Sequence, residues 1–195
     1  MDNVKITLLD YPTGASWIAC KERALVTIKT LKDEDWGTTV PSPEWKRRIL
    51  RARHSPIRCL RFSFYIEGIP YYTSVHLCRH VHAQPYVRSQ RNDRQKQYDR
   101  TKAPQDAPVN MIWDMNAEEL LTIANKRLCE TADLTTREVV QKIVDLVNEV
   151  CPEFKPFLVP PCRMNGTCHE MNPCKRGEAL QARREEVADD DLYKD

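Results

Sequence analysis

Two stretches of the chain alternate apolar and polar side chains, as strands with one buried face do. Residues 4–9 form the first stretch. Residues 58–66 form the second, in which Phe62 and Phe64 fall on the same side. Gly68 is expected to end the second stretch, because glycine weakens a strand interior. The pattern predicts two strands of a sheet with one apolar face.

Helical patterns cover much of the remaining chain. The predicted helices span residues 15–31, 43–53, 70–82, 116–130 and 135–151. Pro85 is expected to follow the third helix and to open a loop that reaches Ser89. The polar, proline-containing residues 95–109 are expected to form a mobile surface loop. Strands and helices together indicate an α+β fold, an antiparallel sheet flanked by helices.

The predicted helix at residues 116–130 carries a polar residue at each end of one face. Asn116 is expected to cap it, with Glu119 at the third position as in a capping box. Arg127 falls on the face of Asn116, about 16 Å along the helix. A second capping box is predicted for Thr135 and Glu138.

Length and composition indicate an ordinary globular protein. The 195 residues suffice for one substantial core with a tail, and 41% are hydrophobic and 30% charged. No run approaches the roughly 20 apolar residues of a membrane span, and the N-terminus lacks a signal-peptide pattern. We therefore expect a cytoplasmic protein without a membrane partner. Its eight cysteines are then thiols or metal ligands rather than a disulfide framework.

The net charge of +2 conceals two basic stretches, at residues 46–61 and 79–102, and an acidic C-terminal end. Solvated surfaces account for such runs, and so does an electropositive cleft that gathers an anionic nucleotide and its cofactor. Binding of polymeric nucleic acid is a third interpretation, which no recognised motif supports.

The most informative motif places several anion-binding groups around one bend. Arg79-His80-Val81 is followed, after seven residues, by Ser89-Gln90-Arg91. A guanidinium group matches phosphate or the carbonyl edge of a pyrimidine, and hydroxyl and imidazole groups both donate and accept hydrogen bonds. The bend is therefore suited to a planar, phosphorylated ligand.

This motif resembles the signature of the flavin-dependent thymidylate synthases, an Arg-His-Arg triplet with Ser-x-Arg seven residues later. Other windows resemble the family in the same order. They are Arg53-His54-Ser55-Pro56, Phe62-Ser63-Phe64, Asn116 with Arg127 eleven residues on, and Cys151-Pro152. The resemblance implies a catalytic domain at residues 1–158, followed by a Cys-rich segment and charged tail at 159–195.

The resemblance implies roles for the matching residues. Arg127 would contact the pyrimidine and favour its activated form, which makes it the expected catalytic residue. The expected substrate-binding residues are His76, Arg79, Ser89, Arg91, Arg100 and Arg127. The expected cofactor-binding residues are Ser55, Arg79, His80 and Asn116. Position alone also allows a surface Arg127 paired with a carboxylate, and a purely structural His80.

The resemblance also implies the reaction. It would be the reductive methylation of dUMP to dTMP, with FAD as cofactor and with NADPH and methylenetetrahydrofolate as co-substrates. The family implies a homotetramer whose sites are shared between subunits.

Five positions depart from the family pattern. Val81 replaces the third member of the triplet, and Val87 stands where a glutamate is usual. Glu118 replaces an arginine expected at the anionic part of the flavin, which reverses a charge. Thr122 and Thr131 stand where an asparagine near the flavin and a histidine near the folate are common. A relative that modifies another pyrimidine nucleotide, and an inert nucleotide- or nucleic-acid-binding module, therefore remain alternatives.

The segment after the matched region holds Cys162, Cys168, His169 and Cys174. Three thiolates and an imidazole are a ligand set for a structural zinc ion, with Zn–S distances of about 2.3 Å. The spacing is not that of CxxC pairs, so reduced thiols and a redox pair stay open beside zinc.

Overall fold

The structure is a computed structural model that describes residues 4–37, 39–91, 99 and 101–192, the side chains of 185–192 excepted. It is an α+β fold, as predicted. Its sheet has the strand order β1-β2-β4-β3, and every neighbouring pair is antiparallel. The strands are β1 (Lys5–Asp10), β2 (Arg61–Pro70), β3 (Gln84–Val87) and β4 (Pro108–Asn116).

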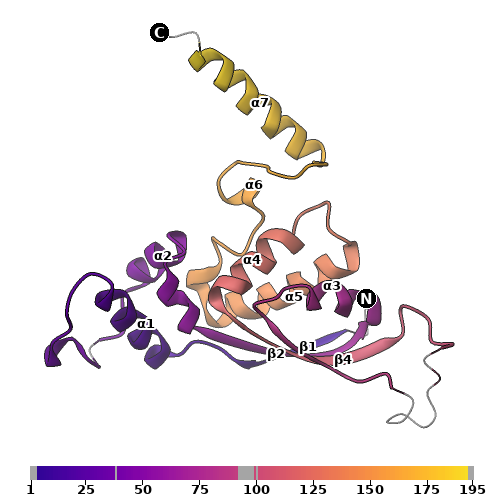
Figure 1. Cartoon of the computed structure of the whole chain (residues 1–195), viewed down its shortest axis with the longest axis horizontal. Coiled ribbons are helices and arrows are strands. Elements are labelled where there is room, and N and C mark those ends of the chain that lie inside the picture. Colours follow the sequence, from indigo (N-terminus) through magenta and orange to yellow (C-terminus); the bar gives the residue numbers. More distant parts are fainter. Residues whose placement is uncertain (1–3, 38, 92–98, 100, 193–195) are drawn as a thin grey trace.

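Helices cover one face of this sheet and one of its ends. Figure 1 shows α3, α4 and α5 over the sheet, with α1 and α2 at the end where β2 begins. The helices are α1 (Gly14–Val26), α2 (Pro43–Arg51), α3 (Tyr71–Cys78), α4 (Ala117–Arg127), α5 (Leu134–Val150), α6 (Pro161–Met164) and α7 (Lys175–Leu192). Short 3-10 turns are η1 (Asp33–Asp35), η2 (Ser55–Cys59) and η3 (Pro152–Phe154).

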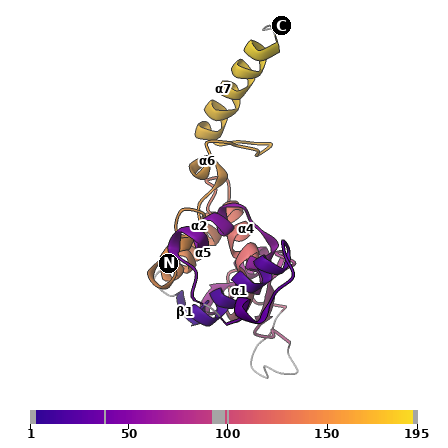
Figure 2. The same ribbon diagram turned by 90° about the vertical axis from the view of Figure 1, so that its left-hand side faces the viewer.

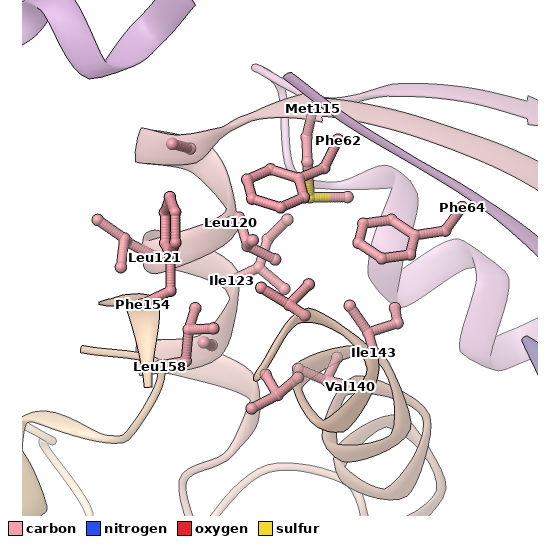
Figure 3. Packing of buried hydrophobic residues seen from close by; sticks show 14 of the residues in the cluster. Phe62, Phe64, Met115, Leu120, Leu121, Ile123, Val140, Ile143, Phe154 and Leu158 are labelled. Carbon is pink, nitrogen blue, oxygen red and sulfur yellow. The ribbon is translucent and has the colours of Figure 1, made fainter. Parts of the chain in front are cut away.

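The hydrophobic core lies between the two central strands and helices α4 and α5. Alternate residues of β2 and β4 point into it and are fully buried, as the alternation of Phe62 and Phe64 predicts. Figure 3 shows these two rings above Leu120, Ile123 and Ile143 from the helices. The core therefore fixes α4, which carries residues of the candidate site, against the end of β4.

Two strands were missed by the sequence pattern. Gln84–Val87 is not a loop but the edge strand β3, which tolerates Pro85 because an edge strand does not need every N–H. The predicted loop at 95–109 overlaps β4, which begins at Pro108; residues 95–98 and 100 lie outside the described part. Gly68 does not end β2. It occupies a bulge with φ of 70°, which glycine adopts at little cost.

Four helices are shorter than predicted, and one of them, α4, ends at Arg127 rather than at residue 130. The first ends at Val26 rather than at residue 31, where β-branched residues become frequent. The second ends at Arg51, and Arg53 has a positive φ of 47°. The third ends at Cys78, so that Arg79 is its C-cap and His80 lies in the turn beyond it. The histidine of the motif is therefore presented by a turn and not by a helix.

The caps of α4 and α5 were predicted with mixed success. The Asn116 side chain accepts a hydrogen bond from the Glu119 N–H at 2.9 Å, which confirms the cap. The Glu119 carboxylate turns instead toward His80, so the reciprocal half of the box is wrong. Helix α5 is capped by Asp133, whose carboxylate accepts from the N–H of Thr136 at 2.8 Å, and not by Thr135.

The C-terminal segment leaves the body of the protein. Figures 1 and 2 both show α7 projecting away from the sheet and its helices, beyond the short α6. Within the described residues, no helix combines the length and the apolar character that crossing a bilayer requires.

Candidate functional site

A buried polar network joins the C-terminal end of α4 to the turn after α3. The Arg127 Nε–H donates to Nε2 of His80 at 2.9 Å, and one terminal amino group donates to the carbonyl of His76 at 3.1 Å. The other ring nitrogen of His80, Nδ1, lies 3.2 Å from a carboxylate oxygen of Glu119. The network therefore runs from a guanidinium group through an imidazole to a carboxylate.

The network fixes the protonation of His80. A guanidinium group has no acceptor, so the Nε2 of His80 must be the acceptor and its Nδ1 must carry the proton. Burial, followed by the charge of Arg127, lowers the pKa of His80 to about 4, which keeps the ring neutral near pH 7. Burial also raises the pKa of Glu119, whose side chain is only 6% exposed.

A second guanidinium group lies next to the first. Burial lowers the pKa of Arg127, and the charge of Arg79 lowers it further. Arg79 is exposed, and its guanidinium group has no hydrogen-bond or ion-pair partner within the described part of the chain. Within the described residues, neither of these two neighbouring cations has a carboxylate partner, and such a pair is the arrangement that an anionic ligand stabilises.

His76 supports the same network from α3. Its carbonyl accepts from Arg127, and its Nδ1 lies 3.2 Å from the hydroxyl of Thr136. The hydroxyl of Tyr72 donates to Thr135 at 3.0 Å. These contacts link α3 to the start of α5. They also position the His76 carbonyl, which accepts the hydrogen bond from Arg127.

A cleft of about 400 Å³ opens at the N-terminal end of α4, on the other side of Glu119. It is lined by Arg58, His82, Asn116, Glu118, Glu119 and Thr122. The first turn of the helix thus presents two carboxylates beside its cap residue. Together with Arg58 and His82, these groups give the cleft mixed charge rather than a basic lining.

The charge reversal at residue 118 has a partner. The Nε–H of Arg58, which lies on η2, donates to the Glu118 carboxylate. That hydrogen bond, more than any other influence, lowers the pKa of Glu118. An arginine from a different segment thus stands beside the position where the family pattern expects one, and its charge is balanced by Glu118.

The other predicted site residues are spread more widely. Ser55 is exposed at the start of η2, in the same turn as Arg58. The hydroxyl of Ser89 accepts from the N–H of Arg91 at 3.2 Å, just beyond β3. Arg100 lies outside the described residues. The structure therefore brings Arg79, His80, His76 and Arg127 together, and it places Ser55 beside the cleft residues.

The cysteines predicted to bind zinc gather around a small cavity. Cys162, Cys168 and Cys174 line it together with Cys129 from the end of α4, whereas His169 is exposed and does not. All are free thiols. Among the described residues, no three His, Cys, Asp or Glu side chains are arranged to hold a metal ion. Thiols of the C-terminal segment and a thiol from just after α4 therefore line the same cavity.

Sequence reasoning missed three residues of these sites, namely Arg58, Glu119 as a partner of His80, and Cys129. Glu119 was assigned to a capping box, because its contact with His80 spans 39 positions and leaves no local pattern. Arg58 was counted only within a basic run. The signal for it was the unexplained Glu118, since a carboxylate at a partly buried position needs a cation.

Comparisons with known proteins agree with this geometry. The sequence model of the thymidylate synthase complementing protein family matches residues 92–153, which include β4, α4 and α5. No curated protein matches the sequence.

Solved structures share the fold. One is the crystal structure of a UMP/dUMP methylase, PolB from Streptomyces cacaoi, bound with 5-Br dUMP. It superimposes with a TM-score of 0.63 at 15% sequence identity and covers 82% of this chain and 98% of its own. The segment matched by the family model contains Asn116 and Arg127. The chain therefore resembles the thymidylate synthase complementing protein family over residues 92–153, and it shares its fold with the methylase.

Proposed function

We propose that the protein methylates a pyrimidine nucleotide at the site formed by Arg79 and Arg127. The finer proposal is the flavin-dependent conversion of dUMP to dTMP, carried out in the cytoplasm by a homotetramer. The match of residues 92–153 to the family model supports the reaction type, and the structural neighbour with a bound dUMP analogue supports the substrate class. The observation that carries the proposal is the pair of neighbouring guanidinium groups. That of Arg127 is partly buried and oriented by two hydrogen bonds, and that of Arg79 has no partner among the described residues.

Arg127 is proposed to act on the pyrimidine ring. Its bonds to His80 and His76 use the Nε–H and one terminal N–H, which leaves three of the five donors of a guanidinium group. The free donors include a forked edge that matches a ring carbonyl. Negative charge develops on that carbonyl when the ring carbon is activated, and a partly buried cation stabilises it strongly.

Arg79 is proposed to bind the phosphate, together with Ser89, Arg91 and Arg100. An exposed arginine suits a phosphate, because water stabilises its charge when no ligand is bound. His76 is proposed to contact the substrate through Nε2, because Nδ1 already faces Thr136. For Ser89, Arg91 and Arg100, the proposed role rests on the family pattern alone.

FAD is proposed as the cofactor because the family is flavin-dependent. When bound, a reduced flavin supplies reducing equivalents, NADPH restores them, and methylenetetrahydrofolate supplies the carbon. The cleft residues suit a diphosphate poorly, because Glu118 and Glu119 are carboxylates and the Arg58 cation is already paired. The amide of Asn116 and the hydroxyl of Ser55 remain as donors. His80 has both ring nitrogens engaged, so it is proposed to meet the cofactor only through its ring face.

Binding measurements test the proposal without requiring turnover. Calorimetric titration with dUMP should give saturable binding to the wild type, and Arg127→Leu should weaken it by about tenfold or more. Arg48→Leu, which removes an exposed arginine of α2, is the matched control and should bind as the wild type does. A wild type that binds neither dUMP nor UMP contradicts the proposal.

A second candidate is methylation of a different pyrimidine nucleotide. The neighbour is described as a UMP/dUMP methylase, and Thr131 stands where the family commonly has a folate-side histidine. Titrations with UMP and dUMP in parallel separate the two candidates, since the ribose hydroxyl is the only difference. An inert nucleic-acid-binding module is the remaining alternative, and it requires oligonucleotide affinity that falls steeply with salt, without affinity for dUMP.

A further inference from the structure

Glu119 is a nearly buried carboxylate whose only side-chain hydrogen bond within the described residues is to His80. Its side chain is 6% exposed, and its Oε1 lies 3.2 Å from Nδ1 of His80. A buried carboxylate costs free energy unless its hydrogen bonds compensate for the lost water. The N-cap bond of α4 is made by the Glu119 backbone and does not need this side chain. The Glu119 carboxylate therefore does not cap the helix, and its hydrogen-bond partner is His80.

The partner is a histidine that is itself held between two charged groups. On one side, Nε2 of His80 accepts from Arg127 at 2.9 Å, and on the other side Nδ1 faces Glu119. The ring also packs edge-on against Trp113, with centroids 6.3 Å apart. A neutral imidazole has one donor and one acceptor, so an acceptor at Nδ1 favours the tautomer whose Nε2 accepts.

We propose that Glu119 is a positioning residue, which orients Arg127 toward the nucleotide by fixing the tautomer of His80. The inference rests on the proposed nucleotide site and adds to it a residue that the family pattern does not assign. With the proton on Nδ1, the ring nitrogen facing Arg127 is a lone pair, and it holds the Nε–H of the guanidinium group. With the proton on Nε2, the same nitrogen would repel Arg127.

The consequence for Arg127 is a fixed orientation. His80 and the carbonyl of His76 together take the Nε–H and one terminal N–H, which lie along one edge of the guanidinium plane. The plane is then fixed by two bonds, and its remaining edge is presented to a ligand. A planar group held at one edge loses less entropy when it binds a carbonyl or a phosphate than a freely rotating one.

The wild-type protein alone provides one test. The nitrogen chemical shifts of the His80 ring, measured by NMR on the folded protein without ligand and assigned through a His80→Gln variant, report which nitrogen carries the proton. We expect the proton on Nδ1. A proton on Nε2 overturns the inference, whether or not the protein binds a nucleotide and whether or not any variant folds.

Variants at residue 119 provide the second test. Glu119→Gln keeps an oxygen that accepts from Nδ1, so dUMP affinity should stay within about threefold of the wild type. Glu119→Leu removes the acceptor at similar size, and affinity should fall by about tenfold. Glu149→Gln, an exposed residue of α5, is the matched control.

The outcomes distinguish this inference from the proposed function. If the wild type binds dUMP and Glu119→Leu binds it equally well, the positioning role is wrong and the nucleotide site stands. Equal losses for the Gln and Leu variants would assign the effect to the carboxylate charge and would also overturn the tautomer role. If the wild type binds no pyrimidine nucleotide, the proposed function fails, while the ring spectrum still decides the tautomer. Urea unfolding of each variant ensures that only folded protein is compared.

Discussion

The clearest quantitative prediction concerns acid stability and His80. Replacing His80 by Gln keeps one donor and one acceptor between Glu119 and Arg127 but removes the titrating group. In the folded protein the pKa of His80 is about 4, against the ordinary value of 6.5. The unfolded chain therefore binds a proton that the folded chain rejects, and stability is lost as the pH falls through this window.

The size of the effect follows from that difference. Applying the linkage relation between pH 7 and pH 4.5, His80 lowers the free energy of unfolding by about 2 kcal/mol. Its side chain is 10% exposed, so solvent does little to reduce the effect. Glu119 acts in the opposite direction, because burial raises its pKa and the folded state then takes up a proton more readily. The side-chain amide in the His80→Gln variant can also donate to the Glu119 carboxylate, so most of that contribution is common to the two proteins.

Urea unfolding followed by tryptophan fluorescence measures the difference at a series of pH values. The wild type should lose about 2 kcal/mol more than His80→Gln between pH 7 and pH 4.5. His169→Asn, which removes an exposed histidine, should follow the wild type. Parallel pH profiles for wild type and His80→Gln would refute a neutral, buried His80 and with it the network built on it.

Three further predictions concern the scaffold. Asn125→Leu should lower the free energy of unfolding by about 3 kcal/mol in urea titrations, because the Nδ2 group donates to the carbonyls of Phe157 and Val159, which would lose their partner; a loss below 1 kcal/mol would contradict this. Asp133→Ala should cost about 1 kcal/mol in the same assay, since it removes the cap of α5, and a neutral result would contradict that cap. Thiol titration of urea-unfolded protein without reductant should find all eight cysteines reactive. Metal analysis of protein purified without chelator tests the zinc hypothesis, which requires at least about one-third of an equivalent of zinc per chain.

Local patterns predicted the parts of the fold that depend on local physics. The alternation around Phe62 and Phe64 predicted β2, and Asn116 was recognised as the cap of α4. Local rules gave wrong results where tertiary contacts decide. Pro85 was expected to open a loop after a helix, although it lies in an edge strand that tolerates it. Gly68 sits in a bulge that lets β2 continue.

The site shows the same division. The residues of the Arg79 motif and Arg127 were identified by their resemblance to the family, and the structure places Arg79, His80 and Arg127 together. The role of Glu119 and the pairing of Arg58 with Glu118 were not predicted, because each joins segments far apart in the chain. Pairings of this kind depend on how the helices pack over the sheet, and no local pattern encodes them.

The most direct test of the central claim is a search for the methylated product. The purified protein would be supplied with FAD, NADPH, methylenetetrahydrofolate and either dUMP or UMP, and the nucleotides would be analysed by mass spectrometry, with Arg127→Leu in parallel. We predict a product heavier than its substrate by one CH₂ group from at least one nucleotide, and none from the variant. Saturable nucleotide binding with no such product would restrict the protein to a binding role, and equal product from Arg127→Leu would contradict the role of the paired guanidinium groups.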